Sequence, residues 1–105
     1  ENNSGDESIS NDNSDYDKAE ICFDRAIELS PLMFKARYNR GKNRIKLKNY
    51  EGAISDLEKA VSINAKHKMT HEQLYIAYMA VGNNVQAMVH YKLAHPGKDK
   101  NEDGE

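Results

Sequence analysis

The stretch that decides the fold is KNYEGAISDLEKAVSINA, residues Lys48–Ala65, because the chain carries its pattern twice more. The other two copies are SDYDKAEICFDRAIELSP, Ser14–Pro31, and GNNVQAMVHYKLAHP, Gly82–Pro96. At intervals of 34 residues, an alanine, a large residue and a second alanine recur. The recurring residues are Ala19, Ala53 and Ala87; Phe23, Leu57 and Tyr91; and Ala26, Ala60 and Ala94. A fixed period of this size indicates an array of helical repeats.

Each copy has the pattern of a helix with one buried face. In the central copy the apolar and alanine residues share one face at helical spacing; they are Tyr50, Ala53, Ile54, Leu57, Ala60 and Val61. Asp15, Asn49 and Asn83 open the three copies, where an N-cap would accept a free helix N–H. Further helices are predicted over Phe34–Leu47 and Lys68–Val81. The sequence thus predicts an all-α chain of five helices, antiparallel because the turns between them are short.

The aligned residues resemble the tetratricopeptide repeat family, over roughly Asp15–His95. The residues that match its pattern of small, large and proline positions are Ala19, Phe23, Ala26 and Pro31; then Gly41, Ala53, Leu57 and Ala60; then Leu74, Tyr78, Ala87, Tyr91 and Ala94. The resemblance implies an α-solenoid of about two and a half repeats. It also implies a protein–protein binding function, as an adaptor or scaffold and not as an enzyme. Tyr75 departs from the family, which has a small residue at that place.

The two ends of the chain are polar. Residues 1–20 hold seven acids and one base, so we expect residues 1–14 to form a disordered acidic arm. The helical repeat domain is expected over 15–95, and residues 96–105 are expected to be a disordered tail. The chain begins with Glu1, which suggests a fragment or a processed product. On this interpretation the first helix of the first repeat is missing.

Composition argues against several classes of protein. The formal net charge is −2, so the chain as a whole is not a polyanion binder. Cys22 is a lone cysteine and no apolar run approaches the ~18 residues of a membrane span, which together favour a reducing, cytoplasmic location. His67 and His71 are four residues apart, but no third metal ligand accompanies them. We therefore expect no catalytic residues, no cofactor and no metal site.

The segment Lys35–Lys48 is strongly basic, with seven basic residues and no acid. On a helix, Arg37, Arg40 and Arg44 form one stripe, which we expect to pair with the acids Glu20, Asp24 and Glu28 of the preceding helix. An alternative is that this stripe stays uncovered and binds the acidic arm of the same or a neighbouring chain.

A second basic stripe is predicted to be the binding site. In the tetratricopeptide family the first helix of each repeat lines a concave groove. The resemblance therefore implies that an acidic or carboxylate-bearing segment of a partner would contact Lys35, Tyr38, Asn39, Lys42 and Lys46. The apolar part of that partner would contact Met69, Gln73, Ile76 and Met79.

Other interpretations of the basic helix stay open. They are a solvated face without ligand, self-association through the unfinished ends into a homo-oligomer, and a small nucleic-acid-binding module using residues 35–48. A co-chaperone-like clamp for chaperone tails fits Asn39, but Met69 and Gln73 stand where that clamp needs bases. Membrane binding is disfavoured because the helix has no broad apolar face.

Overall fold

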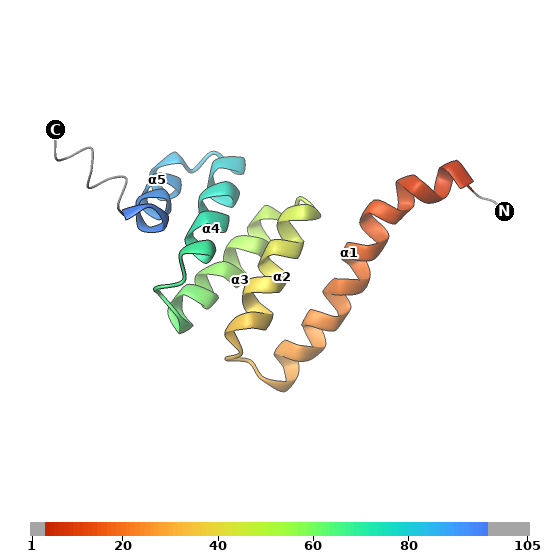
Figure 1. The fold of residues 1–105 in the computed structure, drawn as a ribbon, viewed down its shortest axis with the longest axis horizontal. Helices are drawn as coiled ribbons and strands as arrows, with labels where there is room; N and C mark the ends of the chain where they lie inside the picture. The colour runs from red at the N-terminus through yellow and green to blue at the C-terminus, as the bar shows by residue number, and fades with distance from the viewer. Residues whose placement is uncertain (1–3, 97–105) are drawn as a thin grey trace.

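Five helices follow one another in antiparallel order in the computed structural model, which describes residues 4–96, with side chains from residue 14 onward (Figure 1). They are α1 (Ser4–Leu29), α2 (Phe34–Lys46), α3 (Tyr50–Ile63), α4 (Lys68–Ala80) and α5 (Asn84–Ala94). Each helix packs on the next along the chain, and α2 also contacts α4. The prediction of an all-α helical repeat is confirmed, and residues 4–96 contain no β-strand.

Helix α1 is longer than the sequence pattern predicted. It begins at Ser4 and runs without interruption through Asp15, so Asp15 is a residue of the helix interior and not an N-cap. Residues 4–14 therefore lie within α1, where the sequence pattern led us to expect an acidic arm over 1–14. A physical reason is that extending an existing helix adds one hydrogen bond per residue without a new nucleation cost. In Figure 1 the N-terminal half of α1 leaves the stack of the other helices.

The turns after α2 and α4 have the same geometry, one repeat apart. Asn49 and Asn83 are N-caps as predicted, and their side chains accept hydrogen bonds from the amides of Gly52 at 3.1 Å and Gln86 at 3.2 Å. Gly82 ends α4 with φ 83°, and Lys48 occupies the equivalent place with φ 65°. A left-handed conformation costs a lysine more than a glycine. In the turn between α2 and α3, the helix caps on either side of Lys48, at Leu47 and Asn49, hold that conformation in place.

The apolar core lies where α2, α3 and α4 meet. Ala53, Leu57 and Leu74 are fully buried, and partly buried side chains pack around them: Tyr38, Ile45, Ile54, Val61 and Tyr78. Leu57 reaches Gly41 so closely that a Cβ atom there would lie 2.6 Å from the Leu57 Cγ atom. The small residues of the repeat thus allow α2 and α3 to approach, and the large residue fills the space between them.

Three remaining features of the chain bear on the sequence predictions. Residues 97–105, most of the predicted tail, lie outside the described part of the chain. Cys22 is exposed on α1. Within the described residues, none of the helices combines the length and the apolar character that crossing a membrane requires.

Candidate partner-binding site

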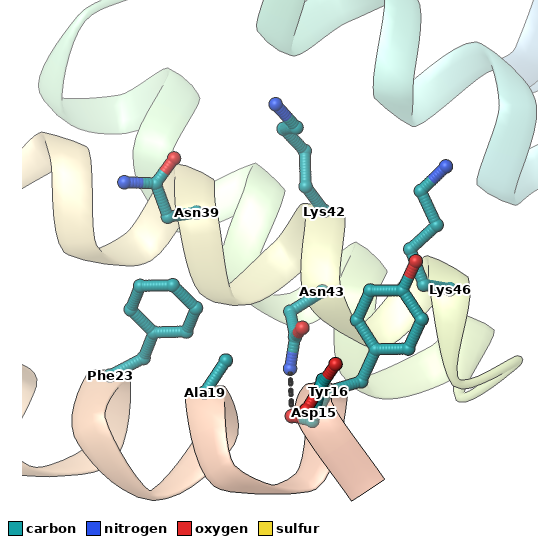
Figure 2. A pocket seen from close by; sticks show the side chains of 8 residues that line it. All are labelled: Asp15, Tyr16, Ala19, Phe23, Asn39, Lys42, Asn43 and Lys46. Carbon is teal, nitrogen blue, oxygen red and sulfur yellow. Dashed lines mark hydrogen bonds between the residues drawn. The ribbon is translucent and has the colours of Figure 1, made fainter. Parts of the chain in front are cut away.

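A cavity of about 360 Å³ opens between α1 and α2 (Figure 2). Eight residues line it: Asp15, Tyr16, Ala19 and Phe23 from α1, and Asn39, Lys42, Asn43 and Lys46 from α2. The α1 residues recur at helical spacing, so they form one face of that helix. The cavity therefore has an apolar and aromatic floor on α1 and a basic, amide-bearing wall on α2.

The wall is held against the floor by a buried asparagine. Asn43 is 7% exposed, and its Nδ2 group donates a hydrogen bond of 2.7 Å to the backbone carbonyl of Tyr16. In Figure 2 the side chains of Lys42 and Lys46 extend away from α1. Asp15 is the single acidic residue among those that line the cavity. The basic wall is therefore only partly compensated by its own surroundings.

The structure divides the predicted site residues of α2 into two groups. Asn39, Lys42 and Lys46 line the cavity together. Lys35 is exposed and outside it, whereas Tyr38 is turned toward α4, with its ring centroid 5.0 Å from that of His67. Burial raises the pKa of Tyr38.

One contact links the two groups on α2. The ring centroid of Tyr38 lies 5.9 Å from that of Phe34, and the Nζ atom of Lys42 lies 5.2 Å from the Tyr38 ring centroid. Tyr38 thus packs within the fold and also supports one of the cavity lysines.

The predicted apolar half of the site lies on α4. Met69 is 54% exposed, Met79 is 45% exposed and Ile76 is 38% exposed, while Gln73 is half-buried. None of these four side chains lines the cavity between α1 and α2. The α4 half of the predicted groove is therefore a surface separate from the cavity that Asn39, Lys42 and Lys46 line.

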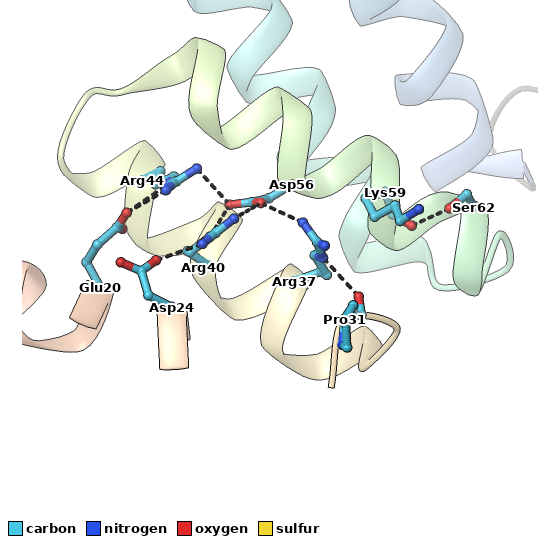
Figure 3. A network of polar contacts seen from close by, with 9 residues as sticks. All are labelled: Glu20, Asp24, Pro31, Arg37, Arg40, Arg44, Asp56, Lys59 and Ser62. Atoms are coloured by element: carbon cyan, nitrogen blue, oxygen red, sulfur yellow. Dashed lines mark hydrogen bonds and ion pairs between the residues drawn. The ribbon is translucent and has the colours of Figure 1, made fainter. Parts of the chain in front are cut away.

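The arginine stripe of α2 is enclosed by acids, and the central acid is one that sequence reasoning missed (Figure 3). Asp56 of α3 is 1% exposed. Its two carboxylate oxygens accept hydrogen bonds of 2.8 Å each from Nε and Nη2 of Arg40. Arg44 lies 3.2 Å and Arg37 lies 3.6 Å from the same carboxylate. The hydrogen bonds to Asp56 raise the pKa of Arg40, against the effect of burial.

The same arginines also reach back to α1. Arg40 contacts Asp24 at 2.7 Å and Arg44 contacts Glu20 at 2.7 Å, so the predicted ion pairs between these helices are present at two places. The third predicted acid, Glu28, makes no ion pair in the described part of the chain, and Arg37 instead donates to the carbonyl of Pro31 at 3.3 Å. Three cations thus face three carboxylates, and the alternative of an uncovered arginine stripe is wrong.

Three histidines make side-chain contacts with groups on neighbouring elements. Nδ1 of His71 lies 2.9 Å from Nδ1 of His90, and Nε2 of His71 lies 2.8 Å from the Ala65 carbonyl. Since a carbonyl only accepts, His71 donates from Nε2 to Ala65. His95 pairs with Glu72 at 2.8 Å. Within the described residues no cluster of three potential metal ligands occurs.

The environment of His90 favours its neutral form. Burial lowers the pKa of His90, Glu58 of α3 at 3.4 Å opposes this, and His71 of α4 adds to it. Tyr78 of α4 donates to the same Glu58 oxygen at 2.6 Å, and burial together with that bond raises the pKa of Tyr78 to about 12. Tyr78 therefore stays a donor throughout the range in which His90 titrates.

We expect acid to destabilise the fold through His90. A pKa that is lowered on folding gives stability that is present above the unfolded value, about 6.5, and is lost as the pH falls through the folded value. Urea unfolding at pH 7.5 and pH 5.0 should show a larger loss for the wild type than for His90→Gln. Titratable groups that do not contact His90 cancel in this difference, so it reports His90 together with its neighbours Glu58 and His71. An equal or smaller loss in the wild type would contradict the neutral assignment.

Paired helices that repeat in this way match a known family of sequences. A family model described as tetratricopeptide repeat matches residues 8–31 and 34–67, which together make up more than half of the chain. The chain belongs to the tetratricopeptide repeat family. Tetratricopeptide repeats are protein-interaction modules and are generally non-catalytic.

Two curated relatives and one solved structure show the same module within longer chains. Anaphase-promoting complex subunit 3 of Schizosaccharomyces pombe is 29% identical over 80 residues, covering 76% of this chain and 12% of that protein. Heat shock protein STI1 of Saccharomyces cerevisiae is 33% identical over 81 residues, covering 76% of this chain and 14% of that protein. The crystal structure of MamA matches with TM-score 0.74 and 24% identity, over 85% of this chain and 52% of MamA, which shows the fold alone.

Within this tetratricopeptide repeat chain, the two complete repeats use different chemistry at equivalent places. One repeat after Arg37, Arg40 and Arg44 stand His71, Leu74 and Tyr78, and one repeat after Asp56 stands His90. The contact of α4 with α5 is therefore built from an apolar residue, a tyrosine and a pair of histidines. The contact of α2 with α3 carries the arginine network instead, and the buried Asp56 is what permits arginines at those positions.

Proposed function

We propose that this repeat module binds an acidic or carboxylate-bearing segment of a protein partner through the lysines of α2. The observation that carries the proposal is the division of the basic charge on α2. All three arginines are neutralised by Glu20, Asp24 and Asp56. Lys35, Lys42 and Lys46 make no ion pair among the described residues and lie on the other side of the helix.

The surroundings of the lysines support a peptide ligand. Asn39 lies beside Lys42 and Lys46 in the cavity and adds an amide that can hydrogen-bond a peptide. The exposed Met69, Ile76 and Met79 on α4 would take apolar side chains of the same ligand, because flexible methionines repack around a partner. Of the two curated relatives, one is by name a subunit of a complex, which accords with binding between proteins.

Capture of partners from a cytosolic extract tests the proposal. The variant with Lys35→Glu, Lys42→Glu and Lys46→Glu should lose proteins that the wild type retains, because the ligand's carboxylates would then face like charges. We expect a loss of at least about tenfold, equivalent to ~1.4 kcal/mol. The matched control reverses three other exposed lysines, with Lys59→Glu, Lys66→Glu and Lys92→Glu.

Circular dichroism establishes first that both variants keep their helices. Equal losses in both variants would mean that only net charge matters, and no loss in either would refute the lysine site. RNA is quantified in the same eluates. If nuclease-sensitive RNA is what the first variant loses, the module is a nucleic-acid binder instead.

A further inference from the structure

The cavity between α1 and α2 occupies the place that the first helix of a repeat fills in the two complete repeats. In the two complete repeats, the second helix is covered by the first: α2 packs on α3, and α4 packs on α5. Ala53 and Leu57 of α3 are consequently fully buried. Their equivalents on α1, Ala19 and Phe23, are only half-buried and line the cavity.

Such a first helix has no source in the described part of α1. A complete first repeat would need a turn before Ala19 that sends the chain back across the face of α1. The structure shows continuous helix from Ser4 to Leu29 instead, so the preceding residues extend away from this face (Figure 1). Among the described residues, nothing covers the apolar floor as α2 and α4 cover its equivalents in the other two repeats.

The electrostatics of the cavity select the occupant. Lys42 and Lys46 form the basic wall, and Asp15 at the other side is the single acid in the lining. A helix placed there would have one side on Ala19 and Phe23 and an adjacent side next to the two lysines. Apolar residues on the first side and acids on the second would complement both surfaces.

We propose that the cavity between α1 and α2 is a docking site for an amphipathic helix of a partner protein, with an apolar stripe and an acidic flank. The helix would lie antiparallel to α1, as α2 lies on α3 and α4 on α5. Opposite Phe23 it would present a small or aromatic residue, because Gly41 meets Leu57 and Tyr75 meets Tyr91 at the equivalent places. The docked helix completes the first repeat. This inference rests on the proposed function, since Lys42 and Lys46 belong to both.

A peptide derived from α4 provides the probe. Helix α4 covers α5 in the complete last repeat, so its α5-facing side has the required shape. A fluorescent peptide of Lys68–Ala80 carries glutamate at four exposed positions, with Lys68→Glu, Met69→Glu, Ile76→Glu and Met79→Glu. A second peptide carries lysine at the same four positions. Fluorescence anisotropy should show saturable binding of the glutamate peptide and at least about tenfold weaker binding of the lysine peptide.

Two matched variants of the protein locate the binding. Ala19→Glu places bulk and negative charge on the floor of the cavity, whereas Cys22→Glu places the same side chain on an exposed part of α1 outside it. We expect Ala19→Glu to weaken peptide binding by at least about tenfold and Cys22→Glu to leave it unchanged, with equal helix content by circular dichroism.

The outcomes separate this inference from the proposed function. If the lysine reversals abolish peptide binding while Ala19→Glu leaves it intact, acidic ligands bind to α2 without entering the cavity; the inference fails and the proposed function stands. Absence of any binding of the glutamate peptide also overturns the inference, but the lysine site is then still tested by the capture experiment.

Sedimentation of the wild type alone tests whether a second copy of the chain occupies the cavity. A dimer that Ala19→Glu dissociates and Cys22→Glu does not would mean that a second copy fills the site.

Discussion

Asp56→Ala is expected to cost at least about 3 kcal/mol of the free energy of unfolding, which is a large share of the stability of a small domain. Asp56 is 1% exposed and is the shared partner of Arg37, Arg40 and Arg44. Without it, three half-buried guanidinium groups face one another with only the α1 carboxylates to balance them. Urea unfolding at pH 7 measures the change.

Two variants calibrate this result. Asp24→Ala removes the outer partner of Arg40. Because the side chain of Asp24 is 48% exposed, the loss should cost only about 0.2–1 kcal/mol of the free energy of unfolding. Asp17→Ala removes an equal charge from an exposed position of α1 that makes no ion pair in the described residues, and its effect should stay within about 0.5 kcal/mol. If Asp56→Ala costs no more than Asp24→Ala, the network is not what holds α3 to α2.

Leu57→Ala is expected to cost about 2–5 kcal/mol, because it opens a cavity among fully buried neighbours. Gly41→Ala alters the same contact from the other helix. Its added Cβ atom would lie 2.6 Å from Leu57 Cγ, and such overpacking costs about 1–3 kcal/mol against a gain of about 1 kcal/mol from helix propensity. The double variant should be at least as stable as Leu57→Ala alone, since the clash disappears with the leucine.

A double-mutant cycle gives the coupling between the two positions. We expect Gly41→Ala to be neutral or stabilising in the Leu57→Ala background and destabilising, or less stabilising, in the wild type, with a coupling of about 1 kcal/mol or more. Equal effects in the two backgrounds would show that Gly41 is retained for some reason other than its contact with Leu57. Alanine at exposed Ser55 serves as a control for propensity on α3.

The repeat architecture could be predicted from the sequence because each of its signals is local or periodic. A helix with a narrow buried face is predicted by the spacing of Ala53, Leu57 and Ala60. The same spacing one repeat earlier and one repeat later predicts that such helices stack on one another. The helix starts at Asn49 and Asn83 were predicted correctly because an N-cap is also a local signal. Its side chain binds the amide of a residue only three positions later. Asp15 carried the same local signal but lies in the interior of α1, because the helix begins at Ser4 and continues through it.

The candidate site was predictable only in part. Lys42, Lys46 and Asn39 share a face of α2, and helical spacing alone placed them together. Tyr16, Ala19 and Phe23 were missed as site residues, because the repeat pattern assigns those positions to a covered interface. The signal that could have revealed them was the polar sequence before Asp15, which offers no apolar helix face to cover Ala19 and Phe23.

The sequence by itself determined the helices, their order, their close-approach alanines and the division of α2 into arginine and lysine stripes, since all of these follow from residue spacing along one chain. Only the tertiary structure decided which charges are neutralised and which helix face is left uncovered. Asp56 and its three arginines meet across two helices, and His71 meets His90 in the same way. Ion pairs, proton positions and an open cavity depend on distances between elements, and those distances are set by packing, not by any local pattern.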